Sequence, residues 1–198
     1  MRRKQTARTK KLKAKRKGAY AWHVSRWKNC KGCVLCKTRN KIVLAKGSIP
    51  CDVLFVGEAP GTSEDIIGKP FVGPAGRLLD RIISDAFPPE IVARCAYTNL
   101  VCCLPKKDGS KLQPTPKQIE ACHDRLVEFV VMSDPLLTVA VGQLSEKHLK
   151  TSLYTKKIGP IVSITHPAAI LRAESIAQSL LVQRAVVTLR DALAELLP

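Results

Sequence analysis

Four short apolar runs along the chain predict the strands of a buried sheet. The first, Val53–Val56, holds four consecutive apolar residues and stops at Gly57. An uninterrupted apolar run of this length, closed by a glycine, is typical of a strand that is buried on both faces, as in a parallel sheet. The other runs have a similar length, and the four predicted strands are 53–56, 96–101, 137–141 and 161–164.

Between these runs, apolar residues recur at helical spacing and predict helices. One start is especially clear, because Thr115-Pro116-Lys117-Gln118 combines an N-cap threonine, a proline in the first helical position and a glutamine in the third. This pattern is the beginning of a capping box. The predicted helices are 20–28, 78–86, 115–130, 144–149 and 174–196.

Strands that alternate with helices predict an α/β fold. We therefore expect a three-layer α/β/α arrangement around a central, mainly parallel four-stranded sheet. In such sheets, ligands bind beyond the carboxyl ends of the strands. Four residues occupy such ends and are the first candidates for a site: Gly57, Asn99, Gly142 and His166.

Charge is distributed very unevenly along the 198 residues. Residues 1–51 contain 17 of the 33 Lys and Arg and no Asp or Glu, so they carry the whole formal net charge of +17. Because like charges repel, we expect a disordered basic arm at 1–19 and a folded domain at 20–198. Such an arm usually contacts a polyanion, nucleic acid before an anionic membrane or an acidic protein. A solubilising or targeting tail is the alternative.

Composition excludes several classes of protein. With 45% hydrophobic and 25% charged residues, the chain has the balance of a globular protein rather than of a disordered one. No apolar run of about 18 residues predicts a transmembrane helix. The basic N-terminal segment also lacks the apolar stretch of a secretory signal. We expect a cytoplasmic, reducing location and no membrane partner.

Eight unevenly spaced cysteines indicate metal binding, since clustered cysteines in a reducing compartment hold metal more often than they form disulfides. Cys30, Cys33 and Cys36 form C-x2-C-x2-C, which is typical of both zinc and iron–sulfur sites. The spacing alone does not separate these two, nor exclude core thiols. Cys51 and Cys95 are interpreted as buried thiols, and the remaining candidates are Cys102, Cys103 and Cys122.

Four motifs follow one another in a fixed order: G-E-A-P-G at 57–61 with a Gly/Pro-rich continuation to 80, T-N-L-V-C-C at 98–103, P-T-P-x4-A-C at 114–122, and H-P-A-A-I-L-R at 166–172. Together they resemble the family 4 uracil-DNA glycosylases, the iron–sulfur members of the uracil-DNA glycosylase superfamily. The resemblance covers about residues 30–195. It implies a uracil-DNA glycosylase-like fold and an enzyme of DNA repair.

The resemblance also implies a [4Fe–4S] cluster. Its ligands would be two cysteines of the N-terminal motif and two later ones: Cys30, Cys33, Cys103 and Cys122. Cys36 would then be a spare thiol. Cys102 stands where the family usually has lysine, so Cys102 and Cys103 compete for one ligand position, and the resemblance favours Cys103.

For base recognition, the resemblance implies three side chains. Asn99 offers a donor and an acceptor to the O4 and N3 edge of uracil. Phe71 stacks on the flipped base. His166 bonds uracil O2, where negative charge builds as the N-glycosidic bond breaks.

A general base is harder to name from the resemblance. A sister family places a catalytic Asp at the position that Ala59 holds here. Glu58 is expected to position water or substrate, and Glu64 is a second carboxylate in the same loop. Main-chain groups of Gly57 and Ala59 are expected to line the pocket.

The implied activity is hydrolysis of the N-glycosidic bond of uracil after base flipping, which leaves an abasic site. We expect a monomer that acts on single- or double-stranded DNA, with the basic arm on the phosphate backbone and Leu171 or Ile170 as a wedge beside Arg172. Leu104 departs from the family, which usually has Arg there. The alternatives are a non-catalytic DNA or uracil-DNA binding module on the same fold, and a zinc-knuckle nucleic-acid protein.

Overall fold

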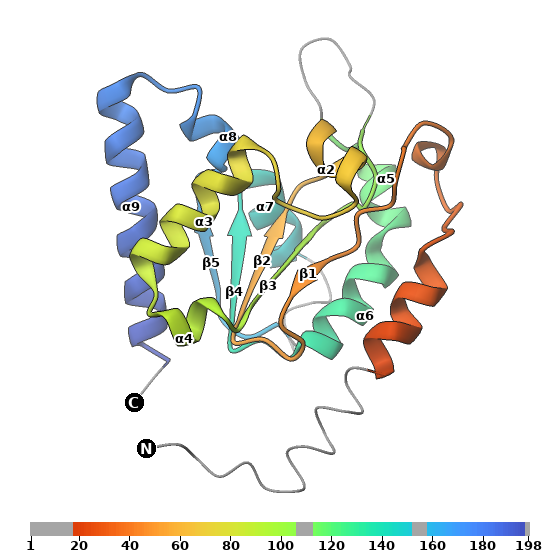
Figure 1. Ribbon diagram of the computed structural model, residues 1–198, viewed down its shortest axis with the longest axis horizontal. Helices are drawn as coiled ribbons and strands as arrows, with labels where there is room; N and C mark the ends of the chain where they lie inside the picture. The colour runs from red at the N-terminus through yellow and green to blue at the C-terminus, as the bar shows by residue number, and fades with distance from the viewer. Residues whose placement is uncertain (1–17, 106–112, 152–157, 197–198) are drawn as a thin grey trace, which may run out of the picture.

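A five-stranded sheet in the order β1-β3-β2-β4-β5 runs through the middle of the molecule (Figure 1). The computed structural model describes residues 18–105, 113–151 and 158–196. Neighbours among β2 to β5 are parallel, and each residue of β2, β3 and β4 is buried, as the apolar runs predicted. The strands are β1 (Lys46–Gly47), β2 (Val53–Gly57), β3 (Cys95–Asn99), β4 (Leu137–Val141) and β5 (Ile161–Ile164).

The strand β1 corrects the prediction of four strands. It pairs antiparallel with β3, with Lys46 opposite Tyr97 and Gly47 opposite Ala96. Gly47 has φ 104°, and a Cβ there would lie 2.8 Å from the Ala96 Cα and closer still to the Cys95 carbonyl. Glycine is thus required at this position. Two residues are too few for a periodic pattern, so no strand signal was visible at 46–47.

Helices cover both faces of the sheet, which confirms the three-layer α/β/α arrangement (Figure 1). On one face lie α3 (Pro74–Ala86), α4 (Pro89–Val92), α8 (Pro167–Ile170) and α9 (Ser175–Ala194). On the other lie a helix at 18–27, α5 (Pro116–Ala121), α6 (His123–Ser133) and α7 (Gln143–Thr151). Two further short helices are the 3-10 helix η1 (Val34–Lys37) and α2 (Thr62–Ile67).

The predicted helix 115–130 is in fact two helices. The capping box at its start is present, since the Thr115 hydroxyl accepts from the Gln118 N–H and the Gln118 amide oxygen accepts from the Thr115 N–H. The break falls at Cys122, which ends α5 and begins α6. The short helices η1, α2, α4 and α8 were not predicted, because one or two turns carry too little periodicity to read.

Residues 18 and 19, the last two of the predicted arm, belong to the first helix. The rest of that arm lies outside the described residues. No helix in the described ranges is long and apolar enough to cross a membrane.

The core is split in two by the sheet. On the α3 and α9 face, Leu79, Ile82 and Ile83 are fully buried against the strands. On the α6 face, Leu126, Phe129 and Val130 are likewise buried against the strands. Each face thus fixes one set of helices to the same sheet, whose carboxyl edge carries the candidate site.

We predict that Leu79→Ala lowers the free energy of unfolding by about 2–5 kcal/mol, because it leaves a cavity beneath α3. Leu180→Ala, at a side chain that is 61% exposed on α9, should change it by less than about 0.5 kcal/mol. Guanidinium unfolding of both variants measures the difference. Equal losses in the two variants would show that α3 does not seal the core.

Candidate functional site

Three of the expected base-binding residues meet at the carboxyl ends of β2 and β3. Gly57 and Asn99 are register partners in neighbouring strands. A Cβ at Gly57 would lie 2.6 Å from the Phe71 ring carbon Cζ and would also overlap the Asn99 side-chain oxygen. The missing side chain of Gly57 is therefore what lets the Asn99 amide and the Phe71 ring lie next to each other.

Phe71 lies in a loop with unusual backbone geometry. Its φ is 53°, in the left-handed region that residues with a Cβ rarely adopt. A Cβ at Gly76 would come within 2.7 Å of the Phe71 Cα, so the first turn of α3 packs directly against this backbone. The Phe71 ring is buried, and its centroid lies 6.1 Å from that of Tyr97.

Glu64 fixes the same loop and is not free for chemistry. Its buried carboxylate accepts hydrogen bonds from the backbone N–H groups of Gly61, Val72 and Gly73, at 3.1, 2.9 and 2.7 Å. We therefore assign Glu64, the second carboxylate noted in this part of the sequence, to holding the loop. The G-E-A-P-G motif and the segment around Phe71 are joined through this one side chain.

Glu58 and His166 come together around Gly142, which follows β4. A Cβ at Gly142 would lie 2.8 Å from the Glu58 Oε1 and 3.1 Å from the His166 Cβ. Burial raises the pKa of Glu58, opposed by hydrogen bonds from the Leu144 backbone and the Gln113 side chain. Gly142 has φ 98°. A side chain there would both strain the backbone and push these two groups apart.

His166 lies two residues after the end of β5 and caps α8. Its Nδ1 accepts a hydrogen bond from the Ala168 N–H at 3.1 Å, which leaves the proton of the neutral ring on Nε2. Burial, aided by the nearby Arg172, lowers the pKa of His166. The ring is thus held neutral, with a single N–H donor.

Ala59 is half-buried beside the α6-face core, next to Glu58. The carbonyls of Gly57 and Glu58 accept from the Leu100 and Val101 N–H groups, at 2.8 and 3.2 Å. These bonds fix the backbone of the expected pocket wall to the segment that follows β3.

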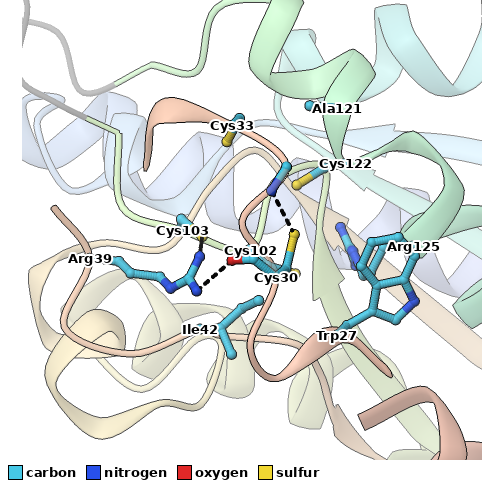
Figure 2. A pocket seen from close by; sticks show the side chains of 11 residues that line it. Trp27, Cys30, Cys33, Arg39, Ile42, Cys102, Cys103, Ala121, Cys122 and Arg125 are labelled. Atoms are coloured by element: carbon cyan, nitrogen blue, oxygen red, sulfur yellow. Dashed lines mark hydrogen bonds between the residues drawn. The ribbon is translucent and has the colours of Figure 1, made fainter. Parts of the chain in front are cut away.

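A second cluster of candidate residues surrounds a pocket between the N-terminal segment and α6 (Figure 2). Five cysteines line it, and Cys36 is not among them. Cys51 and Cys95 are buried elsewhere, and burial raises the pKa of both thiols to about 12. The cysteines that line the pocket are Cys30, Cys33, Cys102, Cys103 and Cys122.

Local contacts separate Cys102 from Cys103. The Cys103 sulfur accepts a hydrogen bond from Arg39 Nη1 at 3.2 Å, while Arg39 Nη2 donates to the Cys30 carbonyl (Figure 2). The Cys102 thiol instead donates to the Leu44 carbonyl at 3.9 Å and is 1% exposed. Arg39 therefore favours Cys103 as the sulfur that develops negative charge.

Arg125 lines the same pocket and was missed by the sequence analysis. It is 2% exposed, and its guanidinium donates to the Thr98 hydroxyl and to the Asn99 and Leu100 carbonyls, at 2.8, 2.5 and 2.9 Å. No carboxylate pairs with it among the described residues, and its Nε has no partner there. The sequence held one sign of a buried arginine, since Arg125 stands next to Leu126 on the apolar side of a predicted helix.

This donor set fits an anionic iron–sulfur cluster. Thiolates bring negative charge, and a buried cation such as Arg125 is stable only when such charge or hydrogen bonds offset its desolvation. Zinc needs its ligands about 2.3 Å from one point. No group of three or more Cys, His, Asp or Glu in the described ranges is arranged around a single ion. In an iron–sulfur cluster each cysteine binds a different iron, so the ligands need not meet at a single ion.

Comparisons with known proteins identify the family. Residues 45–190 match the family described as the uracil DNA glycosylase superfamily. The chain is 34% identical over 170 residues to a type-4 uracil-DNA glycosylase of Pyrobaculum aerophilum, covering 73% of this chain and 81% of that protein. It is 31% identical over 163 residues to one of Thermotoga maritima, covering 76% and 82%.

A solved structure supports the fold alone. The crystal structure of wild-type Pedobacter heparinus SMUG2 superposes with a TM-score of 0.56 at 14% identity, covering 73% of this chain and 76% of that one. By the family match and its type-4 relatives, the chain belongs to the uracil DNA glycosylase superfamily and, within it, to the type-4 family.

We predict that NMR titration finds the pKa of His166 below its ordinary value, with the neutral ring protonated on Nε2. Arg172→Ala should raise that pKa, because it removes a nearby positive charge. Arg190→Ala, at an exposed arginine near the far end of α9, should leave it unchanged. A pKa at or above the ordinary value in the parent protein would contradict the neutral-donor assignment.

Proposed function

We propose that this protein excises uracil from DNA, by flipping the nucleotide out and hydrolysing its N-glycosidic bond to leave an abasic site. The observation that carries the proposal is the position of Asn99, Phe71 and His166 along the carboxyl edge of the parallel strands. Asn99 and Phe71 meet beside Gly57 at the ends of β2 and β3. His166 meets Glu58 beside Gly142, which follows β4. Ligands of open α/β sheets bind at this edge. Membership of the type-4 uracil-DNA glycosylase family supports uracil as the base.

Base selection would rest on Asn99 and Phe71. The Asn99 amide offers one acceptor and one donor to the O4 and N3 edge of uracil, and it would mispair with cytosine or adenine in the same orientation. The Phe71 ring would stack on the flipped base, the usual aromatic platform for a nucleobase. Gly57 and Ala59 would contribute main-chain groups to the pocket wall.

His166 would stabilise the leaving group. As the glycosidic bond breaks, negative charge collects on uracil O2, and a donor already in place there lowers the barrier by a few kcal/mol. The neutral ring suits this task, since its Nε2 proton is available while Nδ1 is occupied by the Ala168 N–H. Glu58 would position water and face the positive charge that develops on the sugar.

The cysteine pocket would hold a [4Fe–4S] cluster on Cys30, Cys33, Cys103 and Cys122. In this role the cluster supplies structural cross-linking of the N-terminal segment to α5 and α6, and takes no part in the reaction. All eight cysteines are free thiols, which suits a reducing, cytoplasmic location. Cys36 stays a spare thiol.

DNA would lie across the same edge of the sheet. Leu171, at the end of α8, is 42% exposed and available as a wedge in the gap left by the flipped nucleotide. Arg172 and the basic arm would contact phosphates, giving an affinity that falls steeply with salt. We propose a monomer acting on single- or double-stranded uracil-DNA.

A non-catalytic binding module on the same fold is the second candidate. It would retain Asn99 and Phe71 for recognition. It would have no use for a neutral donor held at the leaving-group oxygen. The arrangement around His166 therefore favours the enzyme.

We predict that the parent protein releases uracil from a fluorescent single-uracil oligonucleotide under single-turnover conditions, detected by alkaline cleavage of the abasic site. His166→Ala should lower the rate by about 100- to 1,000-fold, the usual cost of one missing donor. His148→Ala on α7 is the matched control and should keep the rate. Absence of product from cluster-loaded parent protein would reject the enzyme and leave the binding module.

We predict that Cys103→Ser purifies with less iron and acid-labile sulfide and with weaker visible absorption than the parent. Cys102→Ser and Cys36→Ser should retain both, because neither sulfur is a ligand in this proposal. Metal and sulfide analysis measures the outcome without reference to activity. Loss of iron from Cys102→Ser but not Cys103→Ser would reverse the assignment, and zinc without sulfide would reject the cluster.

A further inference from the structure

We propose that Lys46 is a positioning residue for base recognition, holding the Phe71 platform in its left-handed conformation from the edge strand β1. The inference rests on the proposed function and deepens it, because it names what keeps the stacking ring in place. No sequence motif includes Lys46. It emerges only from the strand that the sequence analysis did not predict.

Lys46 reaches the Phe71 backbone across the face of Tyr97. In the β1–β3 register it stands opposite Tyr97, and its Nζ lies 4.7 Å from the centroid of the Tyr97 ring. The same Nζ donates to the Phe71 carbonyl at 2.9 Å. The Asp80 Oδ1 of α3 lies 3.9 Å from the ammonium and balances its charge.

The Phe71 loop needs such a restraint. A φ of 53° is unfavourable for phenylalanine and persists only where the surroundings enforce it. Glu64 holds the N–H groups of Val72 and Gly73, just after Phe71, and Gly76 packs against its backbone. Lys46 adds the bond to the Phe71 carbonyl, so the peptide that carries the ring is held on both sides.

The environment of Lys46 suits positioning better than a phosphate contact. The side chain is 25% exposed, and its ammonium is already engaged by a carbonyl, an aromatic face and a carboxylate. Burial lowers the pKa of Lys46. Phosphate contacts call instead for lysines whose ammonium is open to solvent.

The test separates base stacking from DNA binding and from stability. In Lys46→Met we expect about tenfold weaker affinity for free uracil and a similar fall in the single-turnover rate at saturating DNA, which is part of the effect of losing one stacked base. Affinity for uracil-free DNA should be unchanged. Lys46→Arg should restore most of both, because it keeps the donor and the cation over Tyr97.

The matched control is Arg94→Met, which removes a cation bound to Asp52 at the opposite end of β2. It should leave uracil affinity unchanged even if the unfolding midpoint drops. Should Lys46→Met fail to fold, Lys46→Gln and Lys46→Arg test the positioning role instead. Both variants keep a hydrogen-bond donor, but only Lys46→Arg keeps the charge. We expect uracil affinity to fall in the order parent, Lys46→Arg, Lys46→Gln.

Two failures are distinguishable. A parent protein that neither binds nor excises uracil overturns the proposed function, whatever Lys46 does. An active parent whose Lys46→Met variant, or Lys46→Gln where that is used, binds uracil as tightly as the parent overturns the positioning role and leaves the function intact.

Discussion

One buried arginine contacts both the cysteine pocket and the candidate base-binding site. The Arg125 guanidinium lines the cysteine pocket and, on its other side, donates to the carbonyls of Asn99 and Leu100. A charge this deep, without a carboxylate partner among the described residues, is stable only if hydrogen bonds or nearby thiolate charge offset its lost hydration. Arg125 therefore contacts both Asn99, which is proposed to bind the base, and the pocket that is proposed to hold the cluster. A change in the pocket that moves Arg125 would also move the Asn99 backbone.

A second link joins the cysteine segment to α2 through a buried carboxylate. The Asp65 carboxylate of α2 accepts from the backbone and side chain of Asn40, at 3.0 and 2.6 Å, while the neighbouring Arg39 binds Cys103 and the Cys30 carbonyl. The cysteine segment is thus fixed to the helix that follows the G-E-A-P-G motif. Glu64, one residue away, fixes the Phe71 loop. These bonds explain how a structural cluster would stabilise a base pocket that it does not touch.

The sequence predicted what depends on local patterns and missed what depends on long-range contacts. The apolar runs located the four parallel strands, because all-buried strands need no alternation, and the Thr115 capping box marked a helix start correctly. The edge strand at Lys46 was invisible, since only its pairing with β3 defines it. From the sequence, Glu64 was only a second carboxylate beside Glu58, and its three backbone N–H donors show that it holds the loop. Arg125 was hidden in an apolar helix face.

The roles proposed for Glu58 and His166 favour departure of the base over attack by a strong nucleophile. Ala59 leaves no carboxylate at the position where a sister family has its catalytic Asp. Glu58 has its pKa raised by burial, yet hydrogen bonds from Leu144 and Gln113 oppose that shift and favour the charged form. A carboxylate near the sugar and a neutral donor at the base would stabilise opposite charges as they separate. Water would then need only to be held in place, because an oxocarbenium-like sugar is itself strongly electrophilic.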